Sequence, residues 1–294
     1  MQKRWSWVRC ANIALAIVAA ILLVYRGGWI YREVLFRIAG RATVDGLTIY
    51  LDPRDEVITP AILVYGEWEI GESAEMRRLI RPGDTVVDVG ANVGWYTLLA
   101  SSRVGDSGRV IAFEPAQGSL SLLRKSITAN YRSNVSVEPK ALSDRRGSIT
   151  LHIHETNRGG HSILEDAGRT ASVEVETVTL DEYLGGRESE IGLVKIDVEG
   201  AEGLVLAGMR ETLRKRLPRT VIVEFNPSAV RRTGLDPEDV LRRVLEPGYR
   251  VRTLEVWSGR STTMDETGAI DLLKRMEADA TWTDLVFERN DDGR

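Results

Sequence analysis

The segment Thr85-Val86-Val87-Asp88-Val89-Gly90-Ala91-Asn92-Val93-Gly94-Trp95-Tyr96-Thr97 decides the fold of this chain. Its apolar, β-branched beginning is typical of a strand that is buried on both faces. Gly90 and Gly94 follow, and glycine permits both a tight turn and the close approach of a helix to a sheet. A helical pattern comes next. The succession of strand, glycine-rich turn and helix predicts a nucleotide-type pocket in an α/β fold.

The spacing of the two glycines excludes the commonest nucleotide ligands. A dinucleotide site has the pattern Gly-x-Gly-x-x-Gly, but counting from Gly90 its second and third glycine positions hold Asn92 and Trp95. A P-loop needs a lysine that closes the turn, and no Lys or Arg lies between Asp88 and Arg103. The turn therefore favours a cationic nucleoside without phosphate, and S-adenosylmethionine fits this description.

Two acidic residues support this choice of cofactor. Asp88 can take the amino group of S-adenosylmethionine, directly or through water, while the Gly90–Gly94 backbone, including Ala91 and Asn92, passes against its amino-acid tail. Glu114 ends the next apolar run, 26 residues after Asp88, where a carboxylate can accept both ribose hydroxyls. The alternative for each acid is a strand-end carboxylate that caps the following turn.

Four motifs together resemble those of the FkbM-type class I methyltransferases. They are residues 81–97, Phe113-Glu114-Pro115, Ala141-Leu142-Ser143-Asp144, and Lys195-Ile196-Asp197-Val198-Glu199-Gly200-Ala201-Glu202. The first is shared by class I methyltransferases in general, whereas the last is far more specific to this family. The resemblance covers about residues 43–288. It implies a doubly wound, Rossmann-like α/β fold with a seven-stranded, mostly parallel sheet, S-adenosylmethionine as cofactor, and O-methyl transfer.

The resemblance also implies further contacts to the cofactor. Ser143 and Asp144 lie where class I enzymes bind the adenine edge, although a simple turn is the alternative. Tyr65 and Trp68 belong to a segment that covers the cofactor site in the family, so they are expected to line the site beside the methyl donor. Aromatic residues just before a helix more often pack in a core, and that alternative stays open.

Methyl transfer requires alignment of the reactants and removal of a hydroxyl proton. Asp197 ends a strand that should adjoin Gly90, so we expect it to orient or deprotonate the acceptor, with Glu199 as a second candidate. His161 lies between glycines and serine in an expected loop and is a third candidate, although a lone loop histidine is usually a surface residue. Glu202 resembles the acidic first turn of a helix and is expected to be structural.

The sequence predicts no metal site. His152 and His154 share one face of an expected strand but lack a clear third ligand. Glu224 and Asn226 should end a strand beside Asp197, as in catechol-type methyltransferases. Those enzymes use adjacent Asp and Asn residues, whereas Phe225 intervenes here.

Bulk composition indicates a single catalytic domain, residues 43–290. The chain has 294 residues, of which 43% are hydrophobic, enough for one large α/β domain but not for two. The net charge of −4 and the absence of a basic run interleaved with aromatics argue against a nucleic-acid partner. The single cysteine, Cys10, excludes an internal disulfide framework.

The N-terminal segment has the pattern of a membrane anchor, residues 1–26. Residues 11–25 are almost wholly apolar, with basic residues on both sides. This stretch is short for a membrane span. A cleaved signal peptide is the rival, but no small-x-small cleavage site follows; an interfacial or buried helix is a third reading. Residues 27–42 are expected to be a linker or an interfacial helix. Because S-adenosylmethionine is kept in the cytosol, we expect a single-pass membrane protein with a cytosolic catalytic domain.

These observations predict an O-methyltransferase acting on a hydroxyl group of a sugar, a glycolipid or another membrane-associated metabolite. Two alternatives remain open from the sequence. One is N-methylation of a protein or a small amine, which would use the same cofactor-binding part of the site. The other is a non-catalytic module that retains S-adenosylmethionine as a ligand.

Overall fold

The computed structural model describes residues 36–37, 40–166, 169–186 and 190–290. The predicted anchor, residues 1–26, and most of the predicted linker, residues 27–42, lie outside this described part. Within it, no helix combines the length and the apolar character that crossing a bilayer requires.

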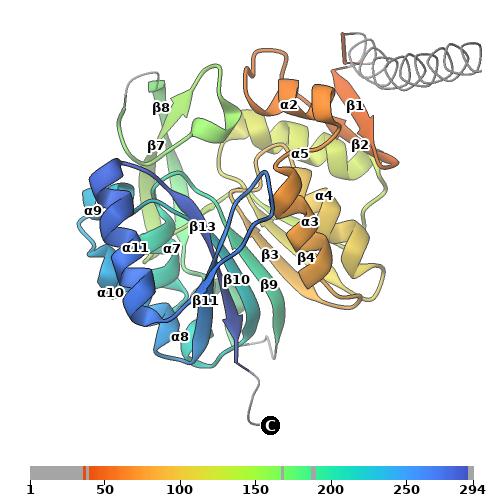
Figure 1. Cartoon of the computed structure of the whole chain (residues 1–294). Helices are drawn as coiled ribbons and strands as arrows, with labels where there is room; N and C mark the ends of the chain where they lie inside the picture. Colours follow the sequence, from red (N-terminus) through yellow and green to blue (C-terminus); the bar gives the residue numbers. More distant parts are fainter. Residues whose placement is uncertain (1–35, 38–39, 167–168, 187–189, 291–294) are drawn as a thin grey trace, which may run out of the picture.

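A central sheet of eight strands organises the fold (Figure 1). The strands, in spatial order, are β12 (Thr263–Met264), β11 (Tyr249–Leu254), β13 (Thr283–Arg289), β10 (Pro218–Phe225), β9 (Ile191–Ile196), β3 (Thr85–Val89), β4 (Arg109–Phe113) and β5 (Val135–Glu138). Neighbours from β10 to β5 are parallel, whereas β13 is antiparallel to both β10 and β11. The seven predicted strands are present, and β12 adds an eighth at the edge. Two residues are too short a run to give a periodic signal, so the sequence did not predict it.

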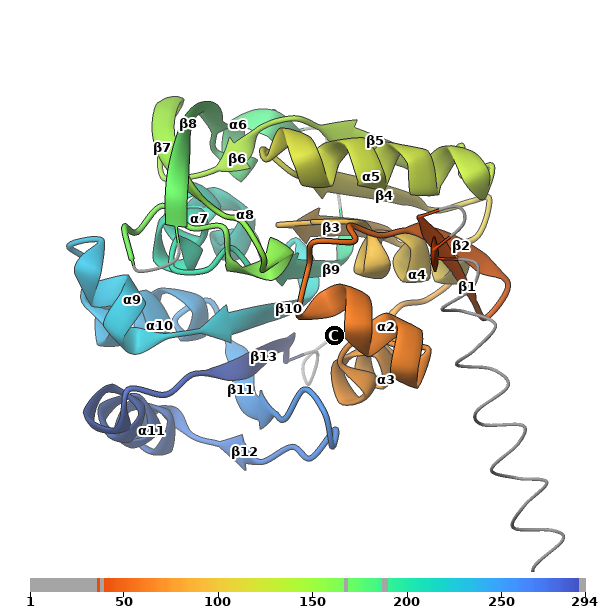
Figure 2. The same ribbon diagram turned by 90° about the horizontal axis from the view of Figure 1, so that it is seen from above.

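Helices cover both faces of this sheet, which confirms the doubly wound arrangement (Figure 2). One face carries α2 (Ile58–Tyr65), α3 (Ile70–Leu79), α4 (Trp95–Val104) and α5 (Gln117–Ala129). The other carries α6 (Leu180–Leu184), α7 (Glu202–Gly208), α8 (Arg210–Arg214), α9 (Pro227–Arg232), α10 (Pro237–Leu245) and α11 (Glu266–Asp279). The sequence analysis predicted the helix after β3 but did not predict α2 or α11.

The strand β3 is buried on both faces, as its β-branched composition predicts. Val86 packs with residues of α3 and α4, while Val87 and Val89 pack in the larger core beneath α7 to α11. Each of these three valines is at most 1% exposed. The strand therefore lies at the centre of the molecule and holds the following turn on a rigid support.

A hairpin precedes the catalytic sheet, as its Asp45-Gly46 turn predicts. The strands β1 (Arg41–Val44) and β2 (Leu47–Tyr50) pair in an antiparallel register across two residues with positive φ, 48° at Asp45 and 77° at Gly46. This is the geometry of a two-residue hairpin turn. The Asn130 side chain accepts from Thr48 N at 2.8 Å and donates to Thr48 O at 2.6 Å, so the hairpin is fastened to the end of α5.

A second, small sheet stands above the carboxyl ends of the main strands. It contains β6 (Ala141–Leu142), β8 (Arg169–Val178) and β7 (Gly147–His154) in that order. These last two strands flank the 157–162 loop, and β7 contains the strand that was expected at His152 and His154. That loop carries a short 3-10 helix, η1 (Arg158–Gly160), and Arg158 Nε donates to Asp52 Oδ2 at 2.7 Å. This buried ion pair ties the loop to the segment before α2.

Candidate active site

A cavity of about 730 Å³ opens at the carboxyl ends of β3, β4, β9 and β10. The chain runs from β3 outward to β5 and then returns to β9 on the other side of β3, so the order of strands reverses here. Ligands of open α/β sheets bind at such a reversal. The volume lies within the range of small-molecule sites.

The turn after β3 forms one wall and requires glycine at its first position. Gly90 has a φ of 85°, and a Cβ atom there would lie 1.8 Å from the carbonyl oxygen of Asp197. Gly90, Ala91 and Asn92 line the cavity. Gly94 does not line it; it precedes α4 with a φ of 97°, and a Cβ there would lie 2.6 Å from Leu123 Cδ1. The two glycines therefore allow the turn to approach β9 and α5.

Asp88 lies behind this wall. Its side chain is 1% exposed, does not line the cavity, and accepts a hydrogen bond from Thr97 Oγ1 at 2.5 Å. Burial raises the pKa of the Asp88 carboxyl to about 6, although the hydrogen bond from Thr97 opposes the rise. The structure thus gives Asp88 a role in holding α4 against β3, and its contact with the cofactor amino group stays a prediction.

Glu114 lines the cavity and is held by two backbone groups. Its Oε2 accepts from Asn92 N and its Oε1 from Ala116 N, each at 2.8 Å. Burial raises the pKa of the Glu114 carboxyl to about 7, and these hydrogen bonds limit the rise. The carboxylate therefore caps the turn before α5 while still facing the cavity, so the two sequence-based alternatives coexist.

The two residues predicted to bind the adenine, Ser143 and Asp144, have different positions in the structure. Ser143 lines the cavity, whereas Asp144 does not. The Asp144 carboxylate instead accepts from Ser143 Oγ at 3.2 Å and lies 3.6 Å from a guanidinium nitrogen of Arg145. Asp144 can therefore position Ser143, and direct contact with the adenine is left to Ser143.

Aromatic side chains form the mouth of the cavity. Tyr65 lines it but is 57% exposed, so it lies at the rim rather than in the core. Trp257 packs edge-on against both Tyr65 and Trp68, with ring centroids 5.9 and 5.8 Å apart. Trp282 also lines the mouth. The sequence analysis missed Trp257 and Trp282, because they come from loops about 190 and about 215 residues further along the chain than Tyr65 and Trp68.

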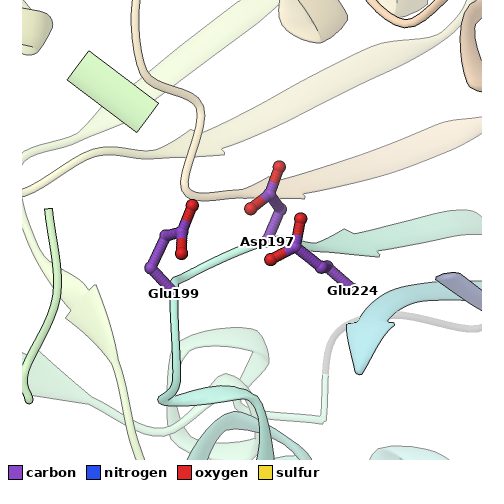
Figure 3. Close-up of side chains that lie close together, drawn as sticks. All are labelled: Asp197, Glu199 and Glu224. Atoms are coloured by element: carbon purple, nitrogen blue, oxygen red, sulfur yellow. The ribbon is translucent and has the colours of Figure 1, made fainter. Parts of the chain in front are cut away.

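Three carboxylates gather at the cavity floor (Figure 3). They belong to Asp197, Glu199 and Glu224, and one oxygen of each lies within 4.8 Å of the others. Asp197 follows β9, and Glu224 lies in the adjacent parallel strand β10. Glu199 reaches the group from a strained position with a φ of 52°. Burial, together with Asp197, raises the pKa of Glu199 to about 8 and that of Glu224 well above its usual value.

Lys195 supplies positive charge to this floor. Its Nζ lies 2.9 Å from Asp197 Oδ2, 3.6 Å from Glu72 Oε1 and 4.4 Å from the centroid of the Tyr96 ring. Burial lowers the pKa of Lys195, but Asp197 and Glu72 outweigh that effect and hold it well above its usual value. Lys195 is therefore a permanent cation that orients Asp197.

A further acidic pair, Glu69 and Glu72, which the sequence analysis missed, lies next to Lys195, and Glu69 lines the cavity. Tyr96 Oη is 2.7 Å from Glu69 Oε2 and 2.6 Å from Glu72 Oε2. One hydroxyl can donate only one hydrogen, so one of these carboxyls must itself donate to the tyrosine oxygen. Burial and the neighbouring Glu72 raise the pKa of Glu69 well above its usual value, which makes Glu69 the protonated partner. No local sequence pattern distinguishes these two glutamates from surface residues at the start of a helix.

His161 lines the cavity, as expected of a site residue, but its ring is arranged as a donor. Its Nδ1 accepts from His154 N at 3.1 Å, and its buried Nε2 has no partner in the described part of the chain. Burial, with Arg158 nearby, lowers the pKa of His161 to about 4. The neutral ring therefore carries its hydrogen on Nε2 and offers a donor to a ligand; its predicted acid–base role stays a prediction.

Two other expectations are resolved by the structure. Glu202 begins α7, and its Oε1 accepts from Gly200 N at 2.8 Å and Val198 N at 3.3 Å, which confirms a structural role. Glu224 or Asn226 was expected to face the crevice; Glu224 lines the cavity, whereas Asn226 does not. Its side chain caps α9 by accepting from Ala229 N at 3.1 Å, because the following proline begins that helix.

Comparison with known proteins identifies the family. The model of the methyltransferase FkbM domain matches residues 88–251. The chain belongs to the FkbM methyltransferase family. Its cofactor is therefore S-adenosylmethionine. The Gly90 turn, which carries no basic residue for a phosphate, and the Glu114 carboxylate both suit this cofactor.

Curated relatives of this FkbM-family protein are 28% to 31% identical to it over the aligned residues. The 31-O-demethyl-FK506 methyltransferase FkbM of Streptomyces tacrolimicus is 31% identical over 50% of this chain and 67% of its own length. The hexuronic acid methyltransferase AglP of Haloferax volcanii is 29% identical over 60% of this chain and 69% of its own. Methyltransferase 1 of Beauveria bassiana is 28% identical over 44% of this chain, and the alignment spans 59% of that relative's length.

A solved structure also resembles this FkbM-family chain. The crystal structure of methyltransferase FkbM from Methylobacillus flagellatus aligns with a TM-score of 0.42 and 17% identity. The alignment covers 78% of this chain and 52% of that one.

Proposed function

We propose that this protein transfers the methyl group of S-adenosylmethionine to a hydroxyl group of a small acceptor that binds over Asp197, Glu199 and Glu224. The observation that carries the proposal is the position of these three carboxylates. They line the same cavity as the Gly90 turn, so the acceptor hydroxyl and the cofactor would meet at the cavity floor.

The residues of the floor have the chemistry that this reaction needs. When bound, S-adenosylmethionine supplies a methyl group on a positively charged sulfur, which is an excellent leaving group. Asp197, oriented by Lys195, can accept a hydrogen bond from the acceptor hydroxyl and take its proton. Glu199 offers a second proton acceptor when it is ionised, above its pKa of about 8. His161 Nε2 can donate to another acceptor oxygen and fix its orientation.

The mouth of the cavity favours a neutral, ring-shaped acceptor such as a sugar. Tyr65, Trp68, Trp257 and Trp282 offer apolar ring faces, and the carboxylates beneath accept hydrogen bonds from hydroxyl groups. The relative AglP is named as a hexuronic acid methyltransferase. Because apolar ring faces and hydrogen-bond acceptors both suit a neutral sugar, we propose a neutral sugar hydroxyl as the acceptor.

The test is methyl transfer by the full-length protein to a panel of acceptors. Neutral methyl glycosides, uronic acids, glycolipids and primary amines are each incubated with S-adenosylmethionine, and mass spectrometry detects S-adenosylhomocysteine and the methylated product. We expect an O-methylated neutral glycoside, loss of activity in Asp197→Asn, and unchanged activity in Glu174→Gln, an exposed residue of β8. Exclusive methylation of amines, or no turnover with cofactor bound, would refute the proposal.

We also propose that residues 1–26 anchor the protein in a membrane with the catalytic domain in the cytosol. The apolar composition of residues 11–25 and the cytosolic supply of S-adenosylmethionine support this. The protein should stay with membranes after alkaline carbonate extraction, and its catalytic domain should be digested by protease in cytosol-side-out vesicles. Protection of that domain in intact vesicles would contradict the orientation.

A further inference from the structure

The floor of the cavity holds more carboxyl groups than the positive charges beside it can balance. Asp197 is paired with Lys195, which Asp197 shares with Glu72. In the described part of the chain, the carboxylates of Glu199 and Glu224 take part in no hydrogen bond or ion pair. Both nevertheless lie within 4.8 Å of Asp197, measured between carboxylate oxygens (Figure 3).

A fourth carboxyl group, more deeply buried, lies beside Glu224 in the sheet. Asp284 in β13 lies directly opposite Glu224 in the antiparallel register, so the two side chains share one face of the sheet. Asp284 is only 2% exposed, and its Oδ2 has no hydrogen-bond partner among the described residues. A buried carboxylate oxygen without a donor is costly, and a cation nearby would remove that cost.

We propose that Asp197, Glu199 and Glu224 bind a hard divalent cation such as Mg²⁺, Mn²⁺ or Ca²⁺, with Asp284 beside it. Oxygen-only ligand sets select such ions. Oxygens on opposite sides of Mg²⁺ are about 4 Å apart, and on opposite sides of Ca²⁺ about 5 Å, from their usual bond lengths. The 4.8 Å limit among the three carboxylates agrees with these separations after small side-chain rotations.

The site would leave room for the acceptor on the cation. Three monodentate carboxylates fill half of an octahedral shell, and all three line the cavity, so the remaining positions face its interior. If the proposed methyl transfer holds, a hydroxyl bound there loses its proton more easily because the cation stabilises the alkoxide. The sequence analysis predicted no metal here because it considered only Glu224 and Asn226 beside Asp197. Nothing in the sequence indicates that the turn at Glu199 brings a third carboxylate to the same place.

Binding of Mn²⁺ tests the site without any acceptor. Full-length protein in mild detergent is titrated with Mn²⁺, and free Mn²⁺ is measured by electron paramagnetic resonance. We expect one Mn²⁺ per chain, displaced by excess Mg²⁺, and at least about 10-fold weaker binding in Glu224→Gln, which replaces a charged carboxylate ligand by a neutral amide. The exposed Glu174→Gln, with the same chemical change, should bind as the wild type does.

The outcomes separate this proposal from methyl transfer. Absence of Mn²⁺ binding by the wild type, or equal binding by folded Glu224→Gln, overturns the cation site. Calorimetry with S-adenosylmethionine on the same preparation shows whether the cofactor pocket is intact, so cofactor binding without Mn²⁺ binding refutes the cation alone. If Glu224→Gln does not fold, Asp284→Asn, which keeps the three ligands but alters their neighbour, should weaken Mn²⁺ binding, and unchanged affinity there also overturns the proposal.

Discussion

Replacement of Glu114 by glutamine should weaken cofactor binding and remove part of its pH dependence. The pKa of Glu114 rises from 4.5 to about 7 on burial. Ionising Glu114 in the folded protein therefore costs about 3 kcal/mol more than ionising an exposed glutamate. From this pKa, about one tenth of the carboxyl groups are ionised at pH 6 and about nine tenths at pH 8. Ribose hydroxyls are donors and therefore stabilise the ionised form.

The expected magnitudes follow from these populations. If the bound cofactor holds Glu114 fully ionised, the apparent affinity of the wild type should rise about 10-fold from pH 6 to pH 8. Glu114→Gln does not titrate, so its affinity should lack this rise. A hydrogen bond to a charged group contributes about 1.5–3 kcal/mol, so at pH 8 the variant should bind about 10- to 100-fold more weakly.

Isothermal titration calorimetry at pH 6, 7 and 8 measures these affinities. S-adenosylhomocysteine serves as a second ligand, because it keeps the ribose but lacks the sulfonium charge. Glu174→Gln is the matched control, since its side chain is exposed and does not line the cavity. Equal pH slopes in the wild type and in Glu114→Gln, or full affinity of the variant at pH 8, would refute the reasoning.

Three further substitutions test the fold and the mouth of the cavity. Gly90→Ala should lower the free energy of unfolding in urea by about 3 kcal/mol or more. Gly83→Ala has the same φ of 85°, but its new Cβ would meet only Ser107 Oγ at an ordinary contact distance of 3.6 Å, so it should cost about 1 kcal/mol; equal costs would contradict the steric argument. Arg158→Met breaks the buried ion pair with Asp52 and should lower the free energy of unfolding by about 3–5 kcal/mol. Arg54 pairs with the same aspartate, but its side chain is 72% exposed, so Arg54→Met should lower it by under about 1 kcal/mol. The reverse order of the two losses would disprove this. Trp257→Ala should raise the KM for the acceptor and leave the Kd of S-adenosylmethionine unchanged, so an equal loss in both would remove this residue from the acceptor site.

Local sequence was sufficient for the elements that position the cofactor. The run from Thr85 to Thr97 predicted the strand, the turn and the helix, because burial on both faces and a positive φ at Gly90 each demand particular residue types. The same holds for the Asp45-Gly46 hairpin and for the acid that ends β4. In each case the determinant lies within a few residues of the feature.

The acidic floor was only partly predictable. Asp197 and Glu199 come from a recognisable motif, but their meeting with Glu224 depends on the parallel pairing of β9 with β10 and on the Glu199 turn. Asp284 joins them because β13 runs antiparallel, so that its beginning lies at the carboxyl edge of the sheet. A single sequence contains no signal for such pairings.

The sequence by itself therefore determined the fold class, the cofactor and the cofactor-side residues of the turn, because local backbone geometry and burial select those residues directly. The tertiary structure alone decided that Asp88 and Asp144 stand behind the cavity wall, that His161 is a donor, and that Trp257 and Trp282 complete the mouth. These roles depend on which distant segments pack against one another. Sheet order and loop packing supply that information through contacts between residues far apart in the chain.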